Sequence, residues 1–543
     1  MENRQENTGI FSPVRMIVLE PMLSAVAILV LTVLTDNLTA AYLGTSLMFY
    51  ALSYGAFSVA GRKRISRVVR MYHDNLFYVN CKDYLWSTLG KSLLMTLVPT
   101  FFLLFFGGRA AEMLKGTVKA GLPLFVCAFC LPVTAAGGVF SGFNEGMRRE
   151  KTVRVFDMFY SVVSPVLLVL FGILGYRYGM KIDALLYTND CAGTYAALFA
   201  TAGILLAGII RMGVLFITVR RVLKKLAPLH ETGKPKYMGE KSPYLKVAWQ
   251  EMLALVMLPA IILVGSAVFS NSSEQSSAEL LGLFYGHYLP YIVLFGVTGA
   301  LSGIGRALAL FTKTQEEEGE PSQSGEKFYE LLHMQCIVSF PVGTFLMALA
   351  PCIEGGIFLR KNQTAELLLT LGGFAGALLS LGIALGILLV LSKRQLPLFL
   401  CALAGAIFSV VAAVLTTVVL GRGIFGMVAA LLIFGLIFNL VAVLMLKVIF
   451  GIRRRPIFLM MVRPFIVSAI SALIISLVSM GLKYLVGEIP ACVISVFLGS
   501  VLYLIMLSVF RGIEEAELRA IPGGRLLEKI SARSRRGKGI RNP

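Results

Sequence analysis

The chain contains fourteen apolar runs long enough to cross a bilayer, and this feature constrains its fold more than any other. A membrane-spanning helix needs about 20 apolar residues, because the hydrocarbon core of a bilayer is about 30 Å thick. The chain is 57% hydrophobic and only 15% charged, with a mean hydropathy of +0.80. A soluble protein of 543 residues could not hide this much apolar surface from water. The sequence therefore predicts an all-α polytopic membrane protein.

Basic residues test the number of spans, because Lys and Arg concentrate in cytoplasmic loops. With the N-terminus inside, the predicted cytoplasmic segments hold 38 of the 50 Lys and Arg residues, and the predicted outer loops hold nine. The net charge of +20 is then mostly topology, and nucleic-acid binding is not expected. Both termini are predicted to be cytoplasmic. The runs lie near residues 14–34, 38–60, 86–106, 119–142, 155–176, 188–219, 247–269, 284–311, 329–355, 364–391, 396–418, 423–446, 464–482 and 489–510.

A polar, proline-containing segment, 225–246, separates the sixth run from the seventh and is typical of a linker. The predicted organisation is two six-helix bundles followed by a helix pair and a basic tail that is expected to lie on anionic lipid headgroups. The predicted parts are an N-terminal bundle (1–224), the cytoplasmic linker (225–246), a C-terminal bundle (247–448), the helix pair (449–510) and the cytoplasmic tail (511–543).

Two similarities between the halves indicate an internal duplication. The motif Ala-Ala-Leu occurs at 196–198 and again at 429–431, an offset of 233 residues. Pro21 in the first run is matched by Pro259 in the seventh, an offset of 238 residues. Two pseudo-symmetric bundles are the arrangement from which secondary transporters build a central cavity and alternating access. The sequence therefore favours a transporter.

Four stretches, together with the 6+6+2 arrangement, carry a family resemblance. They are similar to the lipid-linked oligosaccharide flippase branch of the multidrug/oligosaccharidyl-lipid/polysaccharide exporter superfamily, which includes stage V sporulation protein B and polysaccharide-biosynthesis proteins. The resemblance implies a flippase that moves a polyprenyl-pyrophosphate-linked sugar, such as a peptidoglycan or polysaccharide precursor, from the inner to the outer leaflet of a bacterial plasma membrane. The stretches are GGVFSGFNEGMRREKTVRVFD (137–157), LFYGHYLPYIVLFGVTGALSGIGRALA (283–309), GRGIFGMVAALLIF (421–434) and EEAELRAIPGGRLLEKI (514–530).

Such a flippase needs a wet cavity with cationic groups, because stripping water from a pyrophosphate is costly. Arg306, in the eighth run, is a candidate for the headgroup or for gating, although a position near the span end would also let it snorkel. Glu20 directly precedes Pro21, and a proline bend would open polar space beside the carboxylate. Glu20 is therefore predicted either to bind a coupling proton or sodium ion or to pair with an arginine, such as Arg15.

Weaker candidates lie nearer the ends of the spans. Glu251 precedes Pro259 by eight residues and is favoured as a boundary residue, with a role parallel to Glu20 as the alternative. His287 could carry a proton near neutral pH, but an interfacial aromatic belt with its neighbouring tyrosines is favoured. Lys91 and Arg211 are expected to snorkel towards the headgroups.

Two alternative functions stay open at this point. A cation-coupled multidrug exporter of the same superfamily would use an acidic cavity, whereas the charges within the spans (Arg306, Arg211 and Lys91 against Glu20) lean basic. A membrane-embedded glycosyltransferase or polymerase would need catalytic carboxylates on a sizeable loop, and none is evident. No P-loop or metal-ligand cluster occurs, so neither an enzyme, nor ATP-driven pumping, nor a cofactor beyond a coupling ion is expected.

Overall fold

The computed structural model describes residues 13–74, 78–115, 120–188, 191–226, 249–272, 277–316, 321–358, 362–391, 395–449 and 457–510. These residues are almost entirely helical, and no strand occurs among them. Twelve of the described helices are long and apolar enough to cross a membrane. A bent pair, Gln363–Gly372 and Phe374–Val390, forms a further candidate span with a 44° break, and Leu19–Leu34 is a shorter apolar helix. The predicted all-α membrane fold is confirmed, and within the described residues each of the fourteen predicted runs lies mainly in helix.

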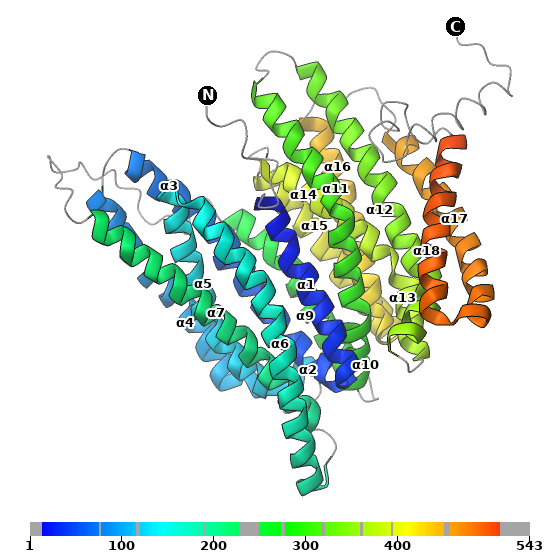
Figure 1. The fold of residues 1–543 in the computed structure, drawn as a ribbon, viewed down its shortest axis with the longest axis horizontal. Helices are drawn as coiled ribbons and strands as arrows, with labels where there is room; N and C mark the ends of the chain where they lie inside the picture. The colour runs from blue at the N-terminus through cyan, green and yellow to red at the C-terminus, as the bar shows by residue number, and fades with distance from the viewer. Residues whose placement is uncertain are drawn as a thin grey trace. The chain divides into compact units, whose positions relative to one another are not determined.

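The chain divides into two compact units, which are described separately. Unit 1 comprises Met1–Pro290 and Gln395–Phe434, and unit 2 comprises Tyr291–Arg394 and Gly435–Pro543. The helices of unit 1, coloured from blue to green and yellow in Figure 1, are α1 (Pro13–Leu34), α2 (Asn37–Ser53), η1 (Tyr54–Gly61), α3 (Arg62–Asp74), α4 (Tyr78–Lys115), α5 (Gly121–Gly146), α6 (Glu150–Leu186), α7 (Cys191–Leu226), α9 (Trp249–Ser272), α10 (Ser277–Leu283), η3 (Phe284–Tyr288), α15 (Gln395–Val414), η4 (Leu415–Val419) and the first part of α16 (Phe425–Ile449).

Helix α5 is the most enclosed helix of the N-terminal part of unit 1, and it packs against α3, α4 and α7. Its glycines allow this close approach. A Cβ added at Gly142 would lie 2.7 Å from the carbonyl oxygen of Arg62, so only a glycine lets the start of α3 pass so near. Phe143 on α5 joins Ile65 of α3 and Leu215 of α7 in one buried apolar cluster. These contacts fix α3, α5 and α7 relative to one another.

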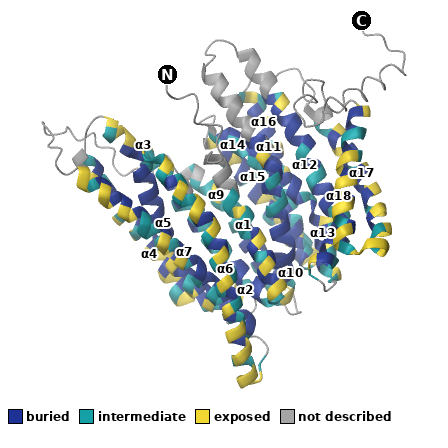
Figure 2. Cartoon of the chain, viewed as in Figure 1, coloured by how far each residue is buried: buried dark blue, intermediate teal, exposed yellow. Residues whose placement is uncertain are grey.

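Large apolar side chains cover the outer faces of the helices, as expected where lipid is the solvent. On α4, the side chains of Val98 and Phe105 are each 75% exposed, and Figure 2 shows exposed residues along the outer helices. In water, such a surface would favour aggregation, whereas in hydrocarbon it has no such cost. The exposed apolar surface therefore supports a multi-pass membrane protein.

Unit 2 is built around α12, which packs against α14, α17 and α18. A buried polar cluster joins its helices: the Nε2 of Gln335 donates to the hydroxyls of Ser339 (2.8 Å) and Ser380 (2.9 Å). The Tyr503 hydroxyl donates to the Ile337 carbonyl at 3.0 Å. The helices are α11 (Leu289–Glu316), α12 (Pro321–Ile357), α13 (Gln363–Gly372), α14 (Phe374–Leu391), the second part of α16, α17 (Ile457–Val486) and α18 (Glu488–Val509).

The two units do not follow the predicted bundle boundaries, because unit 1 also contains α9, α10, η3 and α15. The division into bundles at 1–224 and 247–448, and the duplication behind it, stay predictions. Pro21 and Pro259 lie inside α1 and α9, and both helices continue on either side of the proline. Most of the predicted linker and the whole of the predicted tail lie outside the described residues.

Candidate functional site

Arg211 lies near the middle of α7, and its side chain is only 5% exposed. Its Nη2 and Nε donate to Oδ1 of Asp157 on α6, at 2.8 and 3.1 Å. The same Nη2 lies 3.4 Å from the hydroxyl of Ser141 on α5. A buried guanidinium is tolerated when a carboxylate and further hydrogen-bond acceptors surround it. Arg211 and its two partners lie on three different helices, which the fold brings together.

Asp157 also binds a second arginine, so the ion pair extends into a chain of charges. Nη1 of Arg62, the first residue of α3, donates to Oδ2 of Asp157 at 2.6 Å. The other terminal nitrogen of Arg62 pairs with Glu145 near the end of α5. Two arginines and two carboxylates therefore neutralise one another across α3, α5, α6 and α7. We call Arg62, Glu145, Asp157 and Arg211 the charge chain.

Tyrosines surround Arg211, the member of the charge chain on α7. The guanidinium carbon of Arg211 lies 5.0 Å from the ring centre of Tyr160 and 5.9 Å from that of Tyr54, within the range of cation–π attraction. The hydroxyls of Tyr50 and Tyr160 are in hydrogen-bond contact. Tyr54 is the first residue of the π-helical segment η1, a kind of helix irregularity that is frequent at functional sites. Arg211 is thus held by aromatic faces as well as by Asp157.

Glu20 on α1 completes the site. Its carboxylate lies close enough to the Tyr54 side chain and to the Arg211 guanidinium to interact electrostatically with both. With every group ionised, the site holds three carboxylates (Glu20, Glu145 and Asp157) and two guanidiniums. The charge chain is already balanced, so Glu20 contributes one negative charge in excess. A proton or a small cation would neutralise that charge.

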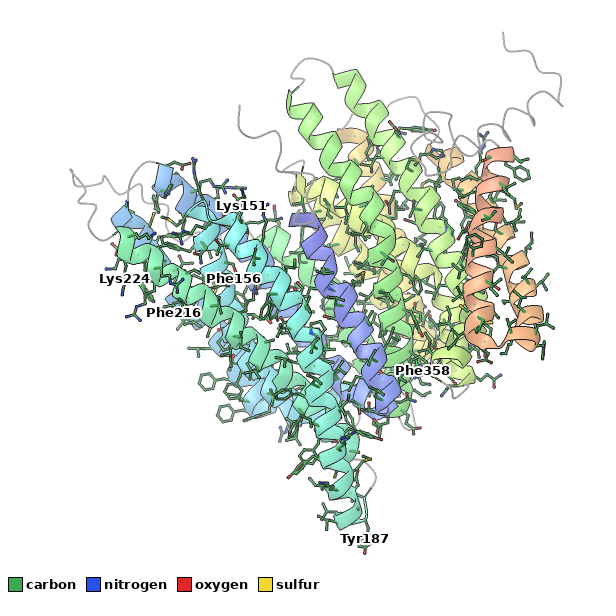
Figure 3. All side chains as sticks on the ribbon, viewed as in Figure 1. Lys151, Phe156, Tyr187, Phe216, Lys224 and Phe358 are labelled. Carbon is green, nitrogen blue, oxygen red and sulfur yellow. The ribbon has the colours of Figure 1, made fainter. Side chains whose placement is uncertain are left out.

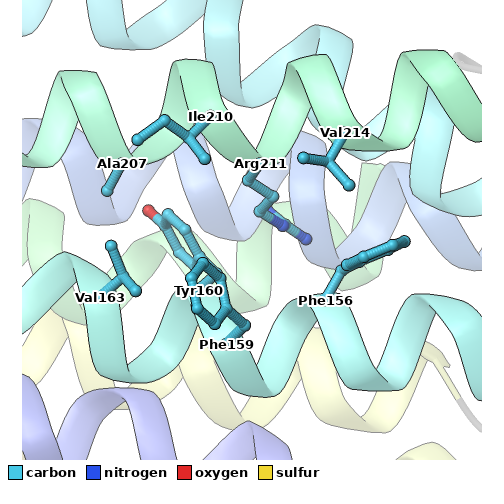
Figure 4. A pocket seen from close by; sticks show the side chains of 8 residues that line it. All are labelled: Phe156, Phe159, Tyr160, Val163, Ala207, Ile210, Arg211 and Val214. Atoms are coloured by element: carbon cyan, nitrogen blue, oxygen red, sulfur yellow. The ribbon is translucent and has the colours of Figure 1, made fainter.

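A shallow groove opens beside the site between α6 and α7. Arg211 and Tyr160 lie among its lining residues, and the other lining side chains are apolar (Figure 4). Phe159 at its rim is 59% exposed, so the groove faces the surroundings of unit 1. The apolar lining residues are Phe156, Phe159, Val163, Ala207, Ile210 and Val214.

Comparison with known proteins identifies the fold. No protein-family model matches the sequence, and no curated protein matches it. Solved structures are similar. The lipid II flippase MurJ, in an inward closed conformation, has a TM-score of 0.62 at 14% identity, covering 91% of this chain and 97% of that chain. An inward-facing multidrug resistance MATE family transporter of the MOP superfamily has a TM-score of 0.56 at 12% identity, covering 80% of this chain and 94% of that chain.

The chain has the fold of the MOP superfamily. The fold that the family resemblance implied is thereby confirmed. Both similar structures belong to transporters.

Within the MOP fold, the structure places two predicted site residues, Glu20 and Pro21, side by side on α1. Glu20 is half-buried and reaches Tyr54, whereas Pro21 is exposed. The side chain of Arg15, the predicted alternative partner of Glu20, lies outside the described side chains. Pro259 is half-buried on α9. The side chains of Glu251 on α9 and Arg306 on α11 are not described, so their predicted roles stay predictions.

Two expectations from the sequence are wrong. Arg211 does not snorkel, because Asp157 lies on the neighbouring helix and holds it inside the unit. Asp157 also neutralises Arg211 there, so this arginine does not add the free positive charge within the spans of unit 1 that the sequence predicts. His287 does not lie in an exposed aromatic belt. It is buried together with Tyr285 and Tyr288, and its Nε2 lies 3.0 Å from Oδ1 of Asn37, because η3 packs inward against α2.

Sequence reasoning missed the charge chain and its tyrosines. Asp157 carried a usable signal, because it is a carboxylate inside the predicted span 155–176. Arg62 gave none, since it begins a run of basic residues typical of a loop. Their pairing joins residues 95 positions apart, and no local spacing reveals such a contact.

Proposed function

We propose that the protein is a secondary-transport flippase that moves a polyprenyl-pyrophosphate-linked sugar from the inner to the outer leaflet of its membrane. The cargo would be a precursor of peptidoglycan or of another polysaccharide. Transport would proceed by alternating access, with no ATP. The lipid tail would stay in the bilayer while the charged headgroup crosses through a hydrated cavity, because burying a bare pyrophosphate in hydrocarbon is prohibitive.

The observation that carries this proposal is the extent of the structural similarity. The likeness to the lipid II flippase covers 91% of this chain, whereas the likeness to the MATE transporter covers 80%. Twelve spans suffice for two bundles, and this chain has a further helix pair, α17 and α18. Their outer faces are strongly apolar, with Leu477 and Phe497 72% and 68% exposed. Such a surface supports a role beside a long lipid tail.

The geometry around Glu20 supports coupling to a proton or sodium ion. Arg211 is already committed to Asp157, so it cannot fully compensate Glu20 as well. A bound cation would remove the remaining charge and weaken the attraction of α1 to the charge chain. Because Glu20 lies on α1 and its contacts lie on other helices, this change would alter how α1 packs. Ion binding would thereby bias the transporter between conformations.

A cation-coupled multidrug exporter is the second candidate function. The excess negative charge at Glu20 favours it as well. The described site in unit 1 has an excess carboxylate and aromatic rings, both of which suit a lipophilic cation. A flippase instead needs cations for the pyrophosphate. Arg306 on α11 is the candidate for that role.

Native mass spectrometry of the purified protein distinguishes the two functions. The ligands are a polyprenyl-pyrophosphate-linked sugar and a lipophilic phosphonium ion, and the variants are Arg306→Ala and Glu20→Gln. For the flippase, we expect the wild type to retain the lipid-linked sugar. Arg306→Ala should weaken binding of this lipid about tenfold, which corresponds to the loss of one charge-assisted hydrogen bond. Glu20→Gln should leave this binding unchanged.

The flippase assignment would be overturned if the wild type retained the phosphonium ion and not the lipid-linked sugar. In that case, phosphonium binding should be lost in Glu20→Gln and unchanged in Arg306→Ala. This outcome would make Glu20 the drug-binding carboxylate of an exporter.

A further inference from the structure

One end of unit 1 carries a strong excess of positive charge. The described residues in 61–74, 78–83, 143–154 and 220–225 include fourteen Lys or Arg and four Asp or Glu. These ranges belong to α3, the start of α4, the turn between α5 and α6, and the end of α7. We call this set the cationic end.

Helix α3 has two different faces. Ile65, Val68 and Val69 are buried against the rest of the unit. Arg67 and Arg70 are exposed on the opposite face. An amphipathic helix with a basic outer face is typical of segments that lie at a membrane surface.

The other parts of the cationic end are held next to α3. Ile65 of α3 lies in one buried cluster with Met147 of the α5–α6 turn and with Val219 and Val222 of α7. Figure 3 shows Lys151 at the start of α6 and Lys224 at the end of α7 at this end of the unit, while Tyr187 marks the opposite end of α6. The cations therefore form one surface rather than separate loops.

Two of the four carboxylates brace this surface. Asp74 pairs with Arg148 at 2.9 Å, and Glu150 pairs with Arg154 at 3.0 Å and also with Arg70. The Asp74–Arg148 pair ties α3 to the α5–α6 turn, and the Arg70–Glu150 pair ties α3 to the start of α6. The end of α7 adds four exposed cations to the surface: Arg220, Arg221, Lys224 and Lys225.

The cationic end lies where the apolar spans stop. Helix runs without a break from Asn37 to Asp74, through the apolar part of α2 and η1 into basic α3. Val155 lies one turn beyond Lys151 on α6, Ile217 lies about one turn before Arg220 on α7, and both are about half exposed, at 52% and 50%. The surface is therefore cationic at headgroup depth and apolar beneath.

We propose that the cationic end binds anionic phospholipids, with phosphate headgroups on α3 and α7 and acyl chains along the apolar faces below. A soluble phosphate would use the cations but not the apolar faces, so the combination favours a lipid. Each Lys or Arg near the surface contributes about 1 kcal/mol to attraction of anionic lipid. The proposal does not depend on which cargo the protein moves.

The test counts lipids bound to the purified protein by native mass spectrometry, with phosphatidylglycerol and phosphatidylcholine of matched acyl chains. The test variant is Arg67→Gln/Arg221→Gln/Lys224→Gln. The control variant is Arg109→Gln/Arg177→Gln/Lys181→Gln, which removes three exposed charges from the other end of unit 1. We expect phosphatidylglycerol to bind the test variant at least fivefold more weakly than the wild type and the control variant less than twofold more weakly.

Equal effects of the two triple variants, or no effect of the test variant, would overturn the proposal, because charge location would then not matter. Displacement of phosphatidylglycerol from the wild type by inorganic pyrophosphate would also overturn it in favour of a soluble phosphate site. Should the test triple fail to purify, Arg67→Gln and Lys224→Gln are measured singly, with Arg67→Lys as the charge-preserving partner that should bind as the wild type does.

Discussion

Arg211 and Asp157 show how a single residue inside a membrane span depends on its partner. The Arg211 guanidinium loses water when it is buried, and Asp157 compensates by accepting from two of its nitrogens. Arg62 donates to the second carboxylate oxygen of Asp157, and Glu145 in turn pairs with Arg62. Removing any one of these four residues would therefore leave the buried charge of its partner uncompensated.

Replacing Asp157 by Ala should destabilise the protein by about 3–5 kcal/mol, because it leaves two arginines without their shared carboxylate. Thermal unfolding in detergent measures the effect. The double variant Asp157→Ala/Arg211→Met should recover part of the loss, since it removes the buried charge as well. The exposed Asp83→Asn is the control and should change little. A single variant as stable as the control would show that the charge chain adds no stability.

Glu20→Gln should uncouple transport from its driving ion, since the neutral amide cannot bind a proton or exchange it for sodium. In proteoliposomes, we expect stimulation by an imposed proton or sodium gradient to fall roughly tenfold, the range of one lost charge-assisted contact. Unfolding temperature should stay close to that of the wild type. Glu112→Gln, an exposed carboxylate at the end of α4, serves as the control. Unchanged stimulation in Glu20→Gln would exclude Glu20 as the coupling site.

At the scale of elements, the site depends on how closely α3 and α5 approach. The chain passes from η1 into α3 at Arg62, so the backbone around Arg62 must lie against α5 for its side chain to reach both Asp157 and Glu145. Glycine at 142 permits this contact, because a Cβ there would meet the Arg62 carbonyl oxygen at 2.7 Å and the Ile65 Cβ at 2.9 Å. Helix packing through small residues is how membrane helices come close.

Gly142→Ala should therefore destabilise the protein, by about 1–3 kcal/mol, the usual cost of overpacking. The obstacle is backbone, which cannot rotate away. Gly213→Ala on α7 is the matched control, because nothing lies within 4 Å of a Cβ added there. That change should be neutral or slightly stabilising, since alanine favours helix over glycine. Thermal unfolding of both variants measures the difference, and equal stabilities would contradict the packing described here.

At the scale of the whole molecule, the fourteen spans predicted from the sequence would place both termini on the same side of the membrane. The distribution of Lys and Arg predicts that this side is the cytoplasm. The cationic end of unit 1 would then face the inner leaflet, where anionic lipids and the proposed cargo are found.

A fluorescent protein fused to the C-terminus should fluoresce in a bacterial host, and an alkaline phosphatase fused there should be inactive. Conversely, a cysteine introduced in the predicted outer loop 273–276 should react with a membrane-impermeant maleimide on intact cells. Phosphatase activity at the C-terminus, together with no labelling of the loop, would mean that the predicted orientation is reversed.

The sequence by itself determined that the chain is an all-α membrane protein and where its apolar helices lie. Hydrocarbon requires about 20 apolar residues and satisfied backbone hydrogen bonds in every span, so a local pattern suffices. It also singled out Glu20, because a carboxylate inside a span is costly wherever its partner lies. The tertiary structure alone decided that Arg211 pairs with Asp157, that Arg62 joins them, and that His287 is buried against Asn37. In a membrane protein, both the lipid-facing and the protein-facing sides of a helix are apolar, so the sequence does not reveal which face meets which neighbour. Only packing settles that, and it turned an arginine expected at the surface into the centre of the site.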